Sequence, residues 1–242
     1  MDPSDVETVF VAGASGGTGR ALLGLLGPRV GTVRALTRSP SSRSALCEAG
    51  ADEVVVDDLL DPDDLVGALE GVDAVLSAVG SGPGALFGSG RRVDGAGNVN
   101  LLEAAVEAGV EAFVMESALG VGDDPRSAMG TAFDLLIRPL QEAKAEAEAA
   151  LREAPVRHTV LRPGVLTNGP RTDDVAVAEP GARLWGTVSR RDVARLMAAA
   201  PVTPAAADRT FEVVAQPPFR DRRLAVDWRL PGDPDRPISV EA

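Results

Sequence analysis

A glycine cluster between an apolar run and a helical apolar pattern constrains this chain more than any other feature. Residues 9–11 are typical of a buried strand, and the apolar residues at 21, 22, 25 and 26 repeat at helical spacing. Between them, Gly13, Gly16 and Gly19 permit a sharp turn and leave room for a pyrophosphate to approach the N–H groups that open the helix. We therefore expect strand, turn and helix, with a nucleotide site at the turn.

The rest of the chain alternates between strand and helix patterns. Further strands are expected at 33–37, 54–56, 73–79, 111–116, 158–162 and, last, 209–214, and helices at 42–49, 62–69 with Asp61 as cap, 93–108, 128–153 with a break at Pro139, and 189–197. Strands separated by helices imply right-handed crossovers and a parallel, doubly wound α/β sheet. We expect a mobile loop at 80–92 beside the site and an irregular tail at 216–242.

Composition narrows the function classes. The 242 residues fit one domain, and a net charge of −12 makes nucleic acid a poor partner. No apolar run is long enough for a membrane helix and the N-terminus lacks an apolar signal core, so we expect a cytoplasmic protein. The acidic, lysine-poor composition suggests a halophilic source, with an acidic mesophile as the alternative. The only cysteine, Cys47, excludes an intrachain disulfide, and we expect it to be buried and structural.

Arg38 bears on which nucleotide would bind. It follows the strand predicted at 33–37, where dinucleotide folds place the group that contacts the adenosine ribose. A carboxylate there would bind a free 2′-hydroxyl, whereas an arginine can pair with a 2′-phosphate. No acid stands at this strand end, which favours NADP over NAD; a solvated surface arginine is the alternative.

Several stretches together resemble the atypical short-chain dehydrogenase/reductases, specifically the NmrA-like and NAD(P)H-binding group that includes biliverdin reductase B and flavin reductase-like proteins. They are the turn at 13–19, Thr37-Arg38, Asp58-Leu59, residues 93–100, Ser117, Lys144, residues 161–164 and residues 189–194. The resemblance spans about residues 6–214. It implies one NAD(P)-binding domain over 1–242, with a Rossmann-type core at about 6–162 and a small substrate-covering part at about 163–242.

The resemblance also implies cofactor contacts. The phosphate turn would consist of Gly13, Ser15, Gly16, Gly17, Thr18 and Gly19. Arg38 would meet the 2′-phosphate, with Thr37 beside it as a further cofactor contact, and Asp58 and Leu59 would meet the adenine. The nicotinamide side would be lined by Ser77, Ala78 and Val79, and the carboxamide would be held by backbone groups of Pro163, Gly164 and Val165.

The chemistry expected from the resemblance is incomplete. Dehydrogenases of this superfamily use a serine that polarises the carbonyl, a tyrosine that supplies the proton, and a lysine four residues later that lowers the tyrosine pKa and binds the nicotinamide ribose. Ser117 and Lys144 match the serine and the lysine, but Leu140 stands at the tyrosine position and the chain contains no tyrosine. Ser117 could instead serve a strand-end hydrogen bond, and Lys144, the only lysine, could lie on a solvated helix face.

Three functions follow as hypotheses. The first is an NADP-dependent oxidoreductase, with NAD possible, that transfers a hydride to a flavin-, quinone- or carbonyl-like small molecule without a tyrosine donor. The second is an NADP-binding regulatory or assembly protein without chemistry, as in NmrA-like proteins. The third, a sugar-nucleotide epimerase or dehydratase, is disfavoured because those reactions depend on the missing tyrosine. We expect a monomer or homodimer that acts on a small molecule, binding neither nucleic acid nor membrane.

Overall fold

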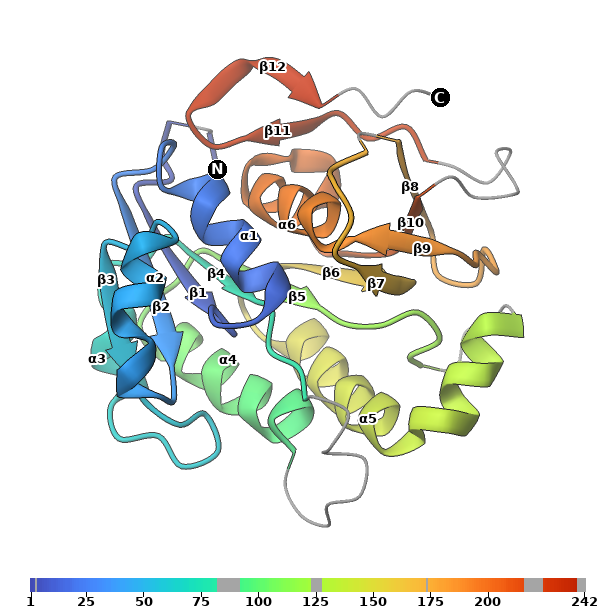
Figure 1. Cartoon of the computed structure of the whole chain (residues 1–242), viewed down its shortest axis with the longest axis horizontal. Helices are drawn as coiled ribbons and strands as arrows, with labels where there is room; N and C mark the ends of the chain where they lie inside the picture. The colour runs from blue at the N-terminus through green and yellow to red at the C-terminus, as the bar shows by residue number, and fades with distance from the viewer. Residues whose placement is uncertain (3, 82–91, 123–127, 173, 216–223, 239–242) are drawn as a thin grey trace.

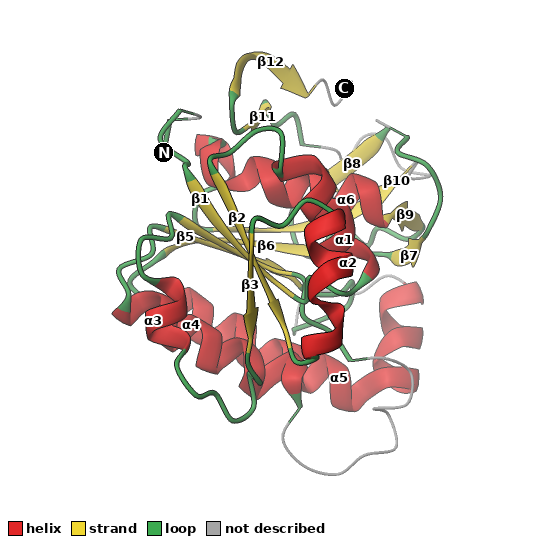
Figure 2. Ribbon diagram, turned by 60° about the vertical axis from the view of Figure 1, so that its left-hand side comes forward, coloured by secondary structure: helices red, strands yellow, loops and turns green. Residues whose placement is uncertain are grey.

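A single large sheet with helices on both faces forms the body of the molecule (Figures 1 and 2). The computed structural model describes residues 1–2, 4–81, 92–122, 128–172, 174–215 and 224–238. Most of the loop predicted at 80–92, and residues 216–223 and 239–242 of the predicted tail, lie outside this range. Within it, no helix is long and apolar enough to cross a membrane.

The eight strands of this sheet follow the doubly wound order β3-β2-β1-β4-β5-β6-β10-β8. They are β1 (Thr8–Ala12), β2 (Thr32–Thr37), β3 (Glu53–Val56), β4 (Ala74–Ser77), β5 (Ala112–Glu116), β6 (Arg157–Pro163), β8 (Val175–Ala178) and β10 (Arg209–Ala215). All neighbours pair in parallel except β8, which is antiparallel to β10. The predicted Rossmann-type α/β fold is confirmed, and the chain reverses direction across the sheet between β1 and β4.

Helices cover both faces of the sheet (Figure 2). One face carries α1 (Gly17–Leu26), α2 (Arg43–Glu48) and α6 (Arg190–Ala199); the other carries α3 (Leu65–Leu69), α4 (Asn98–Glu107) and α5 (Ala128–Glu153). Short helical turns occur at η1 (Pro40–Ser42), η4 (Ala200–Val202) and η5 (Pro204–Ala206). As predicted from Pro139, α5 is kinked, with non-helical dihedral angles at Ile137.

Each face has its own apolar core, because the helical repeat turns one side of every helix toward the sheet. On one face Leu22 and Leu23 of α1 pack with Met197 of α6; on the other Leu101 of α4 packs with Leu151 of α5. All five side chains are almost completely buried. The two cores hold the carboxyl ends of the parallel strands at one edge, where the site lies.

Two predicted helices differ in detail. The helix expected at 62–69 begins only at Leu65, and Asp64 caps it instead of Asp61, with Oδ1 accepting from the Gly67 N–H at 2.9 Å. The helix expected at 93–108 starts as one turn of π-helix, η3 (Val93–Gly97), before α4 continues it.

The C-terminal part holds strands that the sequence pattern did not reveal. They are β7 (Val165–Thr167), β9 (Thr187–Ser189), β11 (Trp228–Leu230) and β12 (Asp233–Ile238), together with β8. The strand predicted at 209–214 is confirmed as β10, but β11 and β12 follow it, so the prediction that it is the last strand is wrong. Within the predicted irregular tail, Trp228 is fully buried and meets the Phe211 ring edge-on at 5.6 Å. β7, β9 and β11 have three residues each, too few for an alternation to be recognised, and the six residues of β12 include two prolines, which argue against a strand.

Cys47 is exposed, so the prediction of a buried cysteine is wrong. Helix α2 has six residues, and it turns only Leu46 into the core. One apolar side chain is enough to anchor so short a helix, and its neighbour Cys47 faces outward.

Candidate dinucleotide site

A pocket opens at the carboxyl edge of the sheet, beyond the ends of the neighbouring strands β1 and β4. Its lining comes from the ends of four strands: Gly13, Ser15 and Gly16 after β1, Leu36, Thr37 and Arg38 at β2, Asp57 and Leu59 after β3, Ala78, Val79 and Gly80 after β4, together with Val93. Ligands of open α/β sheets bind in such a crevice. Of the predicted cofactor contacts, eight therefore lie together here: Gly13, Ser15, Gly16, Thr37, Arg38, Leu59, Ala78 and Val79.

The glycine turn is closely packed against the end of β4. Gly13 has a φ of +71°, and a Cβ on it would overlap the carbonyl oxygen of Ala78. A Cβ on Gly19 would overlap the carbonyl oxygen of Gly13 in the same way. Side chains at these two positions would push the turn out of the crevice, which explains the glycine spacing.

The N-terminus of α1 is suited to an anion. No side chain caps the helix at Gly16, and its first turn contains no acid. Its first N–H groups have no partner within the helix and carry the positive end of the helix dipole. Ser15, Gly16 and Gly17 are exposed there. The turn therefore fits the pyrophosphate of a dinucleotide.

The ends of β2 and β3 form the other side of the pocket. Arg38 is exposed at its rim, whereas Asp57, which sequence reasoning missed, is buried. The Asp57 carboxylate accepts N–H hydrogen bonds from Asp58, Asp63 and Asp64 at 2.7, 3.0 and 3.3 Å, so its role is to hold the loop after β3. Asp58 accepts from the N–H of Leu60 in its own turn and does not line the pocket. Its predicted contact with adenine stays a prediction.

The predicted nicotinamide side is partly engaged in internal hydrogen bonds. Ser77 is fully buried, and its hydroxyl donates to Oδ1 of Asn98 at 2.5 Å. The N–H groups of Gly164 and Val165 donate to the carbonyls of Val213 and Gly186 at 2.9 and 3.1 Å. A carboxamide contact at Pro163, Gly164 and Val165 stays a prediction, and it would have to use groups other than these two N–H donors.

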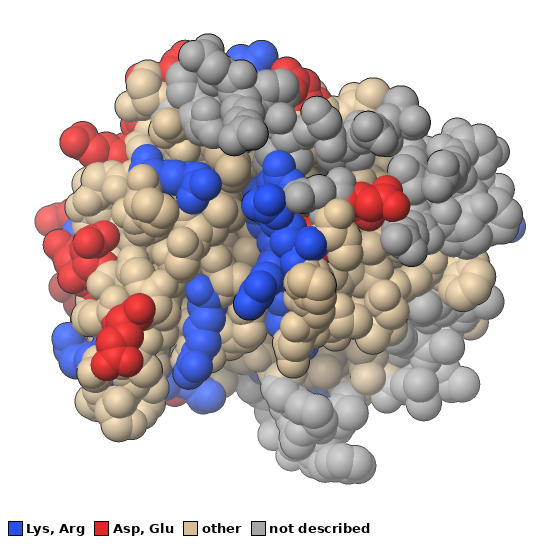
Figure 3. Space-filling view, turned by 45° about the horizontal axis from the view of Figure 1, so that its top comes forward, with Lys and Arg blue, Asp and Glu red and all other residues tan. Residues whose placement is uncertain are grey.

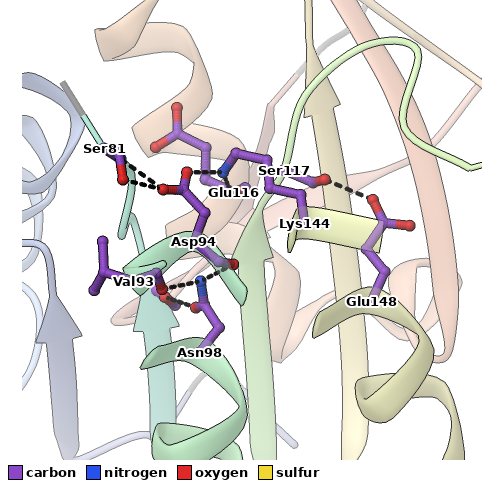
Figure 4. A network of polar contacts seen from close by, with 9 residues as sticks. Ser81, Val93, Asp94, Asn98, Glu116, Ser117, Lys144 and Glu148 are labelled. Carbon is purple, nitrogen blue, oxygen red and sulfur yellow. Dashed lines mark hydrogen bonds and ion pairs between the residues drawn. The ribbon is translucent and has the colours of Figure 1, made fainter. Parts of the chain in front are cut away.

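Lys144 points into the protein rather than into solvent (Figure 4). Its ammonium lies 3.4 Å from Oδ1 of Asp94 and donates to the Glu116 carbonyl oxygen at 3.3 Å; the Lys144 and Asp94 side chains are 12% and 2% exposed. Asp94 in turn accepts from the N–H and the hydroxyl of Ser81. Lys144 is therefore not a residue of a solvated helix face.

Ser117 belongs to a second network, directed toward α5 (Figure 4). Its hydroxyl donates to Oε1 of Glu148 at 2.5 Å, and Glu148 forms a buried ion pair with Arg162 at 2.7 Å. For Ser117 to polarise a substrate carbonyl, its proton would have to leave Glu148. Glu148 and Arg162 were missed as partners because they are far apart in sequence from Ser117.

Glu116, which precedes Ser117, is the other acid that sequence reasoning missed. Its side chain is buried, and Oε1 accepts a hydrogen bond from the Thr18 hydroxyl at 3.1 Å. Burial raises the pKa of Glu116 above its usual value, and the charges of Lys144 and Arg190 and the Thr18 hydrogen bond offset part of this effect. An acid at the end of the apolar run 112–115 is the signal that could have identified it.

Comparisons with known proteins agree with this geometry. A family model described as NAD(P)H-binding matches residues 13–204. An uncharacterized sugar epimerase, YhfK of Bacillus subtilis, is 31% identical over 192 residues, covering 79% of this chain and 86% of its own. Sanguinarine reductase of Eschscholzia californica is 29% identical over 263 residues, covering 89% and 92%. A solved structure of a putative NAD-dependent epimerase/dehydratase from Bacillus halodurans has a TM-score of 0.76 and 28% identity, covering 86% and 94%.

Proposed function

This chain belongs to the NAD(P)H-binding family, and from that membership we propose that it is an NADP-dependent oxidoreductase. It would transfer a hydride to a small molecule of the flavin, quinone or carbonyl type. One observation carries the choice of NADP: Arg38 lies at the rim of the pocket that the glycine turn opens, and among the described lining residues the only acid, Asp57, is occupied by three backbone N–H groups.

Different residues would contact different parts of the cofactor. The α1 N-terminus would bind the pyrophosphate, and the guanidinium of Arg38 would pair with the 2′-phosphate. Lys144 would orient the nicotinamide ribose from α5, where Asp94 holds its ammonium in place. When bound, NADPH supplies a hydride at the nicotinamide ring.

The absence of tyrosine restricts the substrates. A carbonyl that becomes an alcohol needs a proton donor at the oxygen, whereas a flavin or quinone can delocalise the charge and take its proton from water. Positioning of the two reactants supplies much of the rate in such a reaction. We therefore place flavin- and quinone-like acceptors first; that sanguinarine reductase is a relative supports a reductase.

The contact of Ser117 with Glu148 favours a second candidate, an NADP-binding regulator or assembly protein. If the only role of Ser117 is its hydrogen bond to the buried Glu148–Arg162 ion pair, then Lys144 alone remains of the serine, tyrosine and lysine that dehydrogenases of the superfamily use. The relative named as a sugar epimerase supports a third candidate, but a chain without tyrosine lacks the expected proton donor.

Binding and turnover measured together test the proposal. The purified protein is titrated with NADPH and NADH by fluorescence, and is then given flavin, quinone and dichlorophenolindophenol acceptors. We expect tighter binding of NADPH and its oxidation by at least one acceptor. Tight NADPH binding without oxidation by any acceptor would favour the regulator, and preference for NADH would contradict the assignment of Arg38.

A further inference from the structure

Thr18 and Glu116 share a hydrogen bond between the phosphate turn and the carboxyl end of β5. Thr18 stands in the first turn of α1, two residues after the uncapped Gly16. Its hydroxyl donates to Oε1 of Glu116 across 3.1 Å, and both residues are buried. The two are 98 positions apart in the sequence, so only the fold brings them together.

The Thr18 hydroxyl has a single proton, and this limits what it can do. A hydroxyl donates one hydrogen bond and can accept others. While the proton is directed to the Glu116 carboxylate, it is not available to a phosphate oxygen of a dinucleotide at the α1 N-terminus. Moreover, an ionised carboxylate so close to the turn repels the phosphate.

The charged groups around the Glu116 carboxyl come from two other elements. Lys144 reaches it from α5, but its ammonium is shared with the carboxylate of Asp94. Arg190 approaches from α6, but it donates to Oδ1 of Asn168 at 2.8 Å. Both cations favour the ionised carboxyl, but neither forms an ion pair with it among the contacts of the described residues, and burial acts in the opposite direction.

We propose that Glu116 is part of the dinucleotide site and takes up a proton when a cofactor phosphate reaches Thr18. This inference rests on the proposed binding of a dinucleotide at the turn. The neutral carboxyl donates its O–H to Oγ1 of Thr18, and Thr18 then directs its own proton to the phosphate. The proton gained by Glu116 comes from solvent, and no covalent bond forms or breaks.

The sign of the pH dependence follows from linkage. A nearby phosphate raises the pKa of Glu116 further, above the value that burial already gives it in the free protein. The affinity for the dinucleotide is therefore highest at pH values below the pKa that Glu116 has in the free protein. It falls as pH rises from that value to the pKa in the complex, by at most about tenfold per pH unit because one proton is taken up.

The test compares NADPH and NADH dissociation constants between pH 5 and 9 in the wild-type chain and in Glu116→Gln. The Gln side chain is neutral at every pH, and its Nε2–H can donate to Oγ1 of Thr18 as the proposed neutral carboxyl does. Glu146→Gln, the same change at an exposed position of α5, is the matched control. The 2′-phosphate of NADPH itself titrates near pH 6, by analogy with other phosphate esters, but it does so for all three proteins.

We expect the ratio of the wild-type to the Glu116→Gln dissociation constant to rise with pH, and Glu146→Gln to follow the wild type. Calorimetry in buffers of different ionisation enthalpy should show proton uptake by the wild type that is lost in Glu116→Gln. If Glu116→Gln does not fold, Thr18→Val removes the hydroxyl and should reduce the same uptake.

Two results would overturn the inference in distinguishable ways. Binding with the same pH dependence and the same proton uptake in wild type and Glu116→Gln would refute the role of Glu116 and leave the proposed function standing. No binding of either dinucleotide to the wild type at any pH would refute the proposed function, and the inference with it.

Discussion

At the scale of single residues, Arg38 makes the most specific prediction. Replacing Arg38 with Ala removes the guanidinium at the pocket rim and should weaken NADPH binding by about 1.5–3 kcal/mol, the usual worth of a hydrogen bond to a charged group. That corresponds to roughly 10- to 150-fold in the dissociation constant, with little change for NADH. Arg138→Ala, in an exposed ion pair on α5, is the control. An equal loss for both dinucleotides in a fluorescence titration would remove the 2′-phosphate assignment.

Glu116 should also govern the pH dependence of stability. Its pKa is raised in the folded protein, so its favourable contribution is complete below the unfolded value of 4.5 and is lost as pH rises through the folded value. Glu116→Gln should therefore raise the melting temperature at pH 8, by about 2–4 °C for each 1 kcal/mol gained in the free energy of unfolding, and should change it little at pH 4.5. Thermal unfolding by circular dichroism checks this. A variant that is less stable than wild type at pH 8 would show that Glu116 is stabilised in its ionised form.

At the scale of elements, the contact between η3 and α5 positions Lys144. A Cβ on Gly95 would lie 2.8 Å from the carbonyl oxygen of Ala143. Any residue other than glycine at this position would therefore force η3 and α5 apart. Gly95→Ala should cost about 1–3 kcal/mol of stability and weaken NADPH binding, because it displaces Lys144 from Asp94. Gly24→Ala, whose Cβ would meet only ordinary contacts in α1, is the control and should be neutral or slightly stabilising. Unchanged stability in denaturant for Gly95→Ala would contradict this packing.

Buried side chains attach the C-terminal hairpin of β11 and β12 to the body of the molecule, and Trp228 is the largest of those described. Trp228 is fully buried against Phe211, so Trp228→Ala should cost about 3–5 kcal/mol. Trp185, the other tryptophan, is 51% exposed, and its replacement by Ala should change the free energy of unfolding by less than about 0.5 kcal/mol. Similar small effects in urea unfolding for both variants would show that the hairpin is not part of the folded body.

At the scale of the whole molecule, the parts that the sequence predicted are those with a local signal. The alternation of strands and helices through Arg162, the glycine turn and the kink near Pro139 each depend on neighbouring residues, and all are confirmed. The contacts of Glu116 with Thr18 and of Ser117 with Glu148 join residues 98 and 31 positions apart, so no local sequence pattern predicts them. The strands β7, β8, β9, β11 and β12 were missed because only pairing with a partner strand, and no local sequence pattern, identifies them.

The charge of the molecule is unevenly distributed. Although the net charge is −12, Lys and Arg side chains gather in the middle of the face shown in Figure 3, and the acids lie mainly toward one edge. Four arginines line a groove beside α1 and α6: Arg20, Arg171, Arg191 and Arg195. A basic region on an acidic protein raises the local concentration of anionic ligands, which is consistent with a dinucleotide as ligand. The predicted salt adaptation stays a prediction.

We propose that this protein binds NADPH and transfers its hydride to a small molecule. The most direct measurement follows NADPH fluorescence after the NADPH-loaded protein is mixed, without oxygen, with an excess of a quinone or flavin acceptor, using NADPH with hydrogen or deuterium at the transferred position. We expect a single-turnover decay that is slower with deuterium and that requires the protein. Full occupancy of the site by NADPH, with fluorescence that does not decay on any of these acceptors, would contradict it.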